Sequence, residues 1–163
     1  YIPGIALGTS AATFSSQNFG AGERARIAKG ARSGIFMYFC WWLVALVFVI
    51  FLAPTAVKFI TGSSNPEVIK NGVLYLKISI PMIPPMAILV ILRNILQGMR
   101  RPGMPLFCSC LELIGKVIFA LWLVPAFGYL AVCICEPVTW VICCVVIAVA
   151  VFAIRGEFTN RHI

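Results

Sequence analysis

Long apolar runs separated by short polar or basic stretches dominate this chain. Four of them are long enough for helices that cross a hydrocarbon core about 30 Å thick, which takes about 20 residues each. They cover residues 34–53, 66–97, 105–127 and 131–154, and a partial run covers residues 1–18. The pattern predicts an all-α membrane protein with about four full transmembrane helices and part of a fifth.

Glycine and proline positions predict where the first helices end. We expect the first helix to end before Gly20 and Gly22, because glycine allows the backbone to leave the helix. Residues 23–32 include four basic side chains and are predicted to form an interfacial or loop segment. Residues 34–53 form the clearest transmembrane helix, which we expect Pro54 to end.

Residues 66–127 are predicted to form a helical hairpin. Asn65 precedes a proline and an acid, a pattern typical of a helix start. The basic stretch 98–103 turns the chain, and residues 105–127 return across the membrane. Phe127-Gly128-Tyr129 is short enough only for a tight turn, so residues 131–154 form the last span.

The outgoing arm of the hairpin contains three closely spaced prolines. Pro81, Pro84 and Pro85 remove three backbone donors within five residues. At least a kink is therefore expected near the middle of this span, and the three prolines are predicted to act as a hinge.

Composition supports the membrane assignment. Hydrophobic residues make up 61% of the chain and charged residues 11%, against about 45–50% and about 25% in soluble domains. The net charge is +8, but the basic residues lie between apolar spans rather than on a solvated face, which disfavours nucleic acid as a partner. The chain begins within apolar sequence and is expected to be the C-terminal part of a longer protein.

The basic residues of the connections predict the orientation. Eight lie on one side of the predicted spans, which the positive-inside rule makes cytoplasmic. They are Arg24, Arg26, Lys29, Arg32, Arg100, Arg101, Arg155 and Arg161. We therefore expect a multi-pass protein of the cell membrane, the inner membrane in a bacterium, with a cytoplasmic C-terminal tail.

The residues that could carry metal or enzyme chemistry are poorly arranged for it. Seven cysteines lie within apolar segments, six of them in Cys-x-Cys or Cys-Cys spacing, and His162 is the single histidine. This spacing differs from that of zinc and thioredoxin-type sites, so we interpret the cysteines as packing residues and expect no metal site. No triad or phosphate loop is present, and an enzyme is not expected.

Three charged residues inside the hairpin form the first candidate site. Arg93 and Glu112 lie about equally far from the turn at 98–103, so the two helices should bring them face to face. Lys116 follows Glu112 by one helical turn, and the three are predicted to form one buried network. The network either holds two helices together or forms a conformationally switched or proton-linked site.

Two further groups are candidates for a cation site or polar pathway. Glu136 precedes Pro137 and is expected to interrupt the last span, with Trp140 one turn further in. A carboxylate beside a helix-breaking proline could bind a cation or proton, or Glu136 could reach toward the outer interface. Gln17 and Asn18 could line a polar pathway or, more simply, cap the first helix.

Five segments in this order resemble the second half of transporters of the multidrug and toxic compound extrusion (MATE) family, which belongs to the multidrug/oligosaccharidyl-lipid/polysaccharide flippase superfamily. The segments are Gln17-Asn18-Phe19-Gly20-Ala21-Gly22-Glu23-Arg24, Tyr75-Leu76-Lys77-Ile78-Ser79, Leu96-Gln97-Gly98-Met99-Arg100-Arg101-Pro102, Leu111-Glu112-Leu113-Ile114-Gly115-Lys116 and Glu136-Pro137-Val138-Thr139-Trp140. By this resemblance, residues 1–163 are a partial C-terminal lobe containing helices 8 to 12 of a twelve-helix, two-lobe transporter.

The resemblance implies a secondary transporter that exports organic, often cationic and amphipathic compounds in exchange for Na⁺ or H⁺ by alternating access. It implies no bound cofactor besides the coupling ion, and a missing N-terminal lobe of the same chain as partner. Some family members bind the ion with acids on helices seven and ten, but the helix-ten match carries only Glu67 at its outer end. The alternatives are a lipid-linked oligosaccharide flippase of the same superfamily and a non-transporting membrane scaffold.

Overall fold

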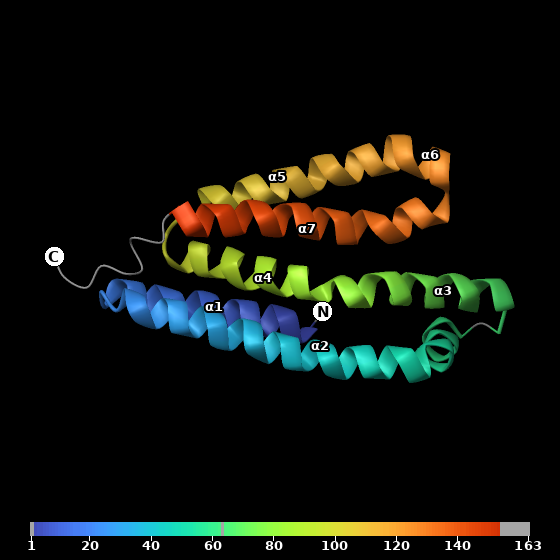
Figure 1. Ribbon diagram of the computed structural model, residues 1–163, viewed down its shortest axis with the longest axis horizontal. Coiled ribbons are helices and arrows are strands. Elements are labelled where there is room, and N and C mark those ends of the chain that lie inside the picture. The colour runs from blue at the N-terminus through green and yellow to red at the C-terminus, as the bar shows by residue number, and fades with distance from the viewer. Residues whose placement is uncertain (1, 63, 154–163) are drawn as a thin grey trace.

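The computed structural model describes residues 2–62 and 64–153, and within these ranges the chain forms helices and short connections without a strand (Figure 1). The helices are α1 (Ile2–Gly20), α2 (Arg24–Thr61), α3 (Pro66–Ser79), α4 (Ile83–Gly98), α5 (Gly103–Ile118), α6 (Val124–Phe127) and α7 (Tyr129–Ala153). A 3₁₀ turn, Ile80–Met82, joins α3 to α4, and a π-helical segment, Phe119–Leu123, joins α5 to α6.

The helices form an elongated bundle with α4 at its centre (Figure 1). Helices α1 and α2 lie on one side of α4, and α5 and α7 lie on the other. Apolar side chains of α4 are buried in the bundle, among them Leu89, Ile91 and Leu96. The α1–α2 and α4–α5 connections share one end of the bundle, so Arg24 and Arg26 lie at the same end as Arg100 and Arg101.

Four helical segments are long and apolar enough to cross a membrane, which confirms the predicted fold class. They cover Arg24–Thr61, Pro66–Gly98, Gly103–Phe127 and Tyr129–Ala153. Large apolar side chains point outward from these helices, among them Phe51, Trp122 and Phe59, the last of which is 88% exposed. Soluble proteins rarely expose apolar surface on this scale, whereas lipid chains would cover it.

Helix α2 differs from the prediction at both ends. Residues 24–32 of the basic segment 23–32 are helical, so this part is not a loop, and the helix does not end at Pro54 but continues to Thr61. Ile27 is fully buried in a cluster with Ile91 and Ile95 of α4, and this contact fixes the first turns of α2 against the bundle. Proline removes one backbone donor, and membrane helices tolerate this loss when the surroundings support the helix.

Other helix boundaries follow the sequence prediction. Helix α1 ends at Gly20, and Gly22 adopts a φ of 75° in the connection to α2. Asn65 caps α3, because its side-chain oxygen accepts a hydrogen bond from the Glu67 backbone N–H at 2.9 Å. Gly128, with a φ of 60°, forms the tight turn into α7.

The three prolines coincide with a change in backbone hydrogen bonding. At the 3₁₀ turn the Ile80 carbonyl accepts a bond from the Ile83 backbone N–H. A regular helix would add a bond from residue 84, but Pro84 has no N–H. The indole N–H of Trp42 takes that place and donates to the Ile80 carbonyl at 2.8 Å. Helix α2 therefore supplies a donor that the proline removes.

Candidate functional site

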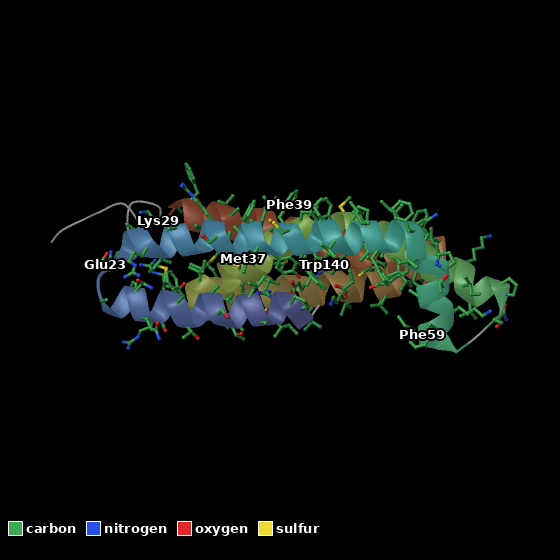
Figure 2. All side chains as sticks on the ribbon, turned by 90° about the horizontal axis from the view of Figure 1, so that it is seen from below. Glu23, Lys29, Met37, Phe39, Phe59 and Trp140 are labelled. Atoms are coloured by element: carbon green, nitrogen blue, oxygen red, sulfur yellow. The ribbon has the colours of Figure 1, made fainter. Side chains whose placement is uncertain are left out.

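Helices α3, α4, α5 and α7 line an open pocket of about 450 Å³. The pocket combines apolar walls with charged groups from three helices, and Trp140 lies in the middle part of the bundle (Figure 2). The lining residues are Tyr75, Met86, Leu89, Val90, Arg93, Glu112, Glu136 and Trp140.

Arg93 and Glu112, predicted to lie at equal depth, form an ion pair across this pocket. Nη2 of Arg93 lies 3.4 Å from Oε2 of Glu112, and both side chains are largely buried, at 20% and 22% exposure. The same Nη2 donates to the Ser109 hydroxyl at 3.4 Å. The hairpin turn produces this contact, because it sets α4 and α5 antiparallel with both residues near the pocket.

Lys116 pairs with a different acid from the one predicted. Its ammonium lies 2.9 Å from Oε1 of Glu136 on α7, whereas Glu112 pairs with Arg93. A pair one turn apart on a helix contributes only about 0.2–0.5 kcal/mol, so it competes poorly with a close contact between helices. The predicted single network is therefore replaced by two pairs that share one pocket wall.

The four charges sum to zero, with one carboxylate and one base in each pair. Glu112 and Glu136 both line the pocket, while Lys116 is not among the lining residues and remains 47% exposed. An isolated charge inside a bilayer costs at least about 2.5–3.5 kcal/mol, and pairing offsets this cost. A cation that entered the pocket would compete with Arg93 or Lys116 for a carboxylate.

The predicted interruption at Glu136-Pro137 does not occur. Helix α7 is continuous from Tyr129 to Ala153, and Pro137 is buried within it. One proline removes only the donor to the Cys133 carbonyl, and the rest of the turn keeps its bonds. Trp140, 6% exposed, packs against Leu89 and Cys143 in the main apolar cluster and also lines the pocket.

Gln17 and Asn18 lie away from the charged pocket, at the end of α1. Asn18 is buried, and its side-chain amide donates to the Phe14 carbonyl at 2.7 Å. The backbone carbonyl of Asn18 accepts a hydrogen bond from the Glu23 backbone N–H at 2.8 Å, and this bond closes the turn into α2. Gln17 is exposed and lines a shallow pocket with Phe19 and Arg100. The hydrogen bonds of Asn18 are thus local to the helix end.

Two residues of the site, Ser109 and Tyr75, were not among the candidate site residues predicted from the sequence. Ser109 lies three positions before Glu112, so it shares the helix face that meets Arg93. Tyr75, on α3, reaches the pocket because α3 continues into α4 and packs on α7. The spacing of Ser109 could have identified it once the ion pair was assumed, whereas Tyr75 depends on the helix packing.

Within the described residues, no group of three or more His, Cys, Asp or Glu side chains is placed to hold a metal ion. The seven cysteines are free thiols, and Cys108, Cys133 and Cys143 are buried. The Cys143 thiol approaches the Cys108 carbonyl at 3.6 Å, a contact within the apolar core between α5 and α7. This placement fits packing residues.

Comparison with known proteins adds the family. The family model MatE matches residues 1–122, which is 122 of the 163 residues and covers α1 to α5. The chain belongs to the MatE family. MatE proteins are transporters, so this chain is a multi-pass membrane protein of a transporter family. The matched part includes Arg93, Glu112 and Lys116, while Glu136 lies beyond it. No curated protein and no solved structure gives a significant match to the chain.

Proposed function

We propose that this MatE-family chain exports organic compounds in exchange for a cation, Na⁺ or H⁺, by alternating access. The observation that carries the proposal is the pocket in which two carboxylates, Glu112 and Glu136, each pair with a base between apolar helices. Ionisable residues inside a membrane bundle commonly mark ion or proton pathways. In a transporter family, a neutral cluster with two carboxylates is suited to cation exchange.

The coupling step acts on the ion pairs. When H⁺ or Na⁺ binds Glu136, the attraction between Glu136 and Lys116 weakens, and α5 and α7 lose the 2.9 Å contact that joins them. Binding at Glu112 weakens the link to Arg93 on α4 in the same way. Because each pair joins two different helices, occupancy of a carboxylate changes the relative free energy of two arrangements of the bundle.

The pocket walls suit a cationic amphipathic substrate. Trp140 and Tyr75 offer aromatic rings, and Met86 offers an adaptable apolar surface. A cationic substrate bound near the carboxylates would compete with the coupling cation for the same negative charge. Such competition at one pocket produces antiport, because the two cations cannot both be bound there.

The 3₁₀ turn at Ile80–Met82 provides the bending element in this proposal. Pro81, Pro84 and Pro85 lower the number of backbone bonds that must break when α3 moves relative to α4. We also propose that the basic end of the bundle faces the cytoplasm of a bacterial cell. The five helices then act as helices 8 to 12 of a two-lobe transporter, together with another lobe of the same protein.

Flux measurements with the full-length protein in vesicles test this proposal. A fluorescent organic cation is loaded into proteoliposomes, and an inward proton or Na⁺ gradient is imposed separately. We expect one of the gradients to drive dye release and its collapse by an ionophore to stop it. Transport of lipid-linked oligosaccharide without dye flux would instead indicate a flippase, and the absence of both activities would support a scaffold.

A further inference from the structure

A second pocket, of about 400 Å³, lies between α1, α2 and α4 near the basic end of the bundle. None of the four charged residues of the candidate site lines it. Figure 2 looks onto this side, where α1 and α2 run in front of α4, with Lys29 near the basic end and Met37 further along α2. The pocket is therefore separate from the proposed transport site.

The pocket is lined mainly by apolar side chains and by three serines, and two basic side chains stand at its mouth. Leu7 and Phe14 of α1, Met37 of α2 and Ile95 of α4 form the apolar walls. At the end near the α1–α2 connection, Arg26 and Lys29 project from the first turns of α2. Both are exposed, and among the described residues neither forms an ion pair. The mouth thus carries two basic side chains that form no ion pair with the described acids.

A buried hydroxyl provides an independent indication of a ligand. Ser15 lines the same pocket and is 1% exposed, and no group in the described part of the chain hydrogen-bonds to its Oγ. A buried hydroxyl without a partner costs about 1–3 kcal/mol. The position of Ser15 favours a ligand with a hydrogen-bonding group between its charged end and its apolar end.

We propose that this pocket binds one anionic phospholipid. Its phosphate lies between Arg26 and Lys29, the Ser15 hydroxyl donates to an ester or glycerol oxygen, and an acyl chain follows Leu7 and Met37. The volume holds a headgroup and the first part of a chain, and the exposed side chains of Ile5 and Phe36 offer a surface for the remainder. Basic pockets between membrane helices recognise anionic headgroups in this way.

The charge distribution argues against the other occupants. An organic cation would meet Arg26 and Lys29 at the mouth and be repelled, so the pocket does not suit the proposed transport substrate. A free phosphate would use the mouth but leave the apolar walls and Ser15 uncovered. The inference depends on the location of the chain in a membrane and is independent of whether it transports.

The test is lipid binding to the purified full-length protein in detergent, followed by native mass spectrometry. Phosphatidylglycerol, phosphatidylcholine and inorganic phosphate are titrated in separate experiments. We expect one phosphatidylglycerol to bind more tightly than phosphatidylcholine. The double substitution Arg26→Gln/Lys29→Gln should lower phosphatidylglycerol affinity about thirty-fold, because each base contributes about 1 kcal/mol at an anionic surface.

Two further variants test whether the loss of affinity comes from this pocket. Arg32→Gln/Lys58→Gln removes the same charge from α2 at positions outside the pocket and should leave the affinity unchanged. Ser15→Ala should lower it about fivefold while preserving the charge of the mouth. The proposal is overturned if both lipids bind equally, if the Arg32/Lys58 variant loses as much affinity as the Arg26/Lys29 variant, or if inorganic phosphate competes fully with the lipid.

Discussion

The Lys116 ammonium lies 2.9 Å from Oε1 of Glu136, so the closest ion pair of the site joins α5 to α7. In the sequence the two helices are connected through the π-helical segment and the turn at Gly128. The ion pair adds a second link, across the pocket that also holds Arg93 and Glu112. Helix α5 is therefore held to α4 by one pair and to α7 by the other.

The link between Lys116 and Glu136 should appear as an energetic coupling. We expect Lys116→Met and Glu136→Gln each to lower the thermal stability of the detergent-solubilised full-length protein, and the double variant to lose less than the sum. Partial exposure of both side chains limits the coupling to about 1 kcal/mol. Lys70→Met, at an exposed position on α3, combined with Glu136→Gln serves as the additive control. Additive losses in the Lys116/Glu136 cycle would show that the contact does not contribute.

Substitution of Glu112 should lower transport without changing membrane insertion. Glu112→Gln removes the charge that Arg93 neutralises, while the shape of the side chain is nearly retained. We expect export of an organic cation from cells to fall about tenfold, equivalent to about 1.4 kcal/mol of coupling. Membrane levels should stay unchanged. Glu67→Gln, exposed at the start of α3, is the matched control. Unchanged export together with unchanged stability would exclude Glu112 from the mechanism.

The bond from Trp42 to the Ile80 carbonyl gives a prediction about the hinge. Trp42→Phe removes the indole donor and should cost about 1 kcal/mol of stability, because the carbonyl then lacks its second donor. Pro84→Ala supplies a backbone N–H that can donate to Ile80, so it should reduce the effect of Trp42→Phe. Thermal unfolding of the wild type, the two single variants and the double variant measures this. If Trp42→Phe costs the same in both backgrounds, the indole does not replace the missing backbone donor.

The contact between α1 and α4 depends on a glycine. A Cβ at Gly98 would meet the backbone carbonyl of Ala12 and lie 3.0 Å from the Cβ of Ser15. Gly98→Ala should therefore destabilise the protein by about 1–3 kcal/mol, the usual cost of overpacking. At Gly103 a Cβ meets nothing within 4 Å, so Gly103→Ala is the control. Equal melting temperatures of the two variants would contradict the close packing of α1 on α4.

The sequence predicted the features that depend on local pattern. Apolar runs identified the four long helices, and Asn65 and Gly128 marked a helix start and a turn because their chemistry acts within a few residues. The facing positions of Arg93 and Glu112 followed from the hairpin, since antiparallel helices joined by a short turn have a fixed register. The roles of these residues in transport stay predictions.

Features that depend on packing between helices distant in the sequence could not be predicted from the sequence alone. Helix α2 continues past Pro54 because its surroundings support it, and Ile27 extends it to Arg24 through contacts with α4. Lys116 pairs with Glu136 rather than with Glu112 because α7 packs beside α5. The donor from Trp42 lies 38 residues from its acceptor. Each of these depends on which helix is the neighbour, and the hydrophobic pattern does not specify neighbours.

Glu136→Gln tests the proposed coupling between the carboxylates of the charged pocket and a cation gradient. In proteoliposomes containing the full-length protein, gradient-driven release of an organic cation and exchange of that compound without a gradient are measured side by side. We expect Glu136→Gln to lose gradient-driven release and to retain exchange, because Glu112 and the apolar walls still bind the substrate while the cation site at Glu136 is impaired. Gradient-driven release at the wild-type rate would contradict it.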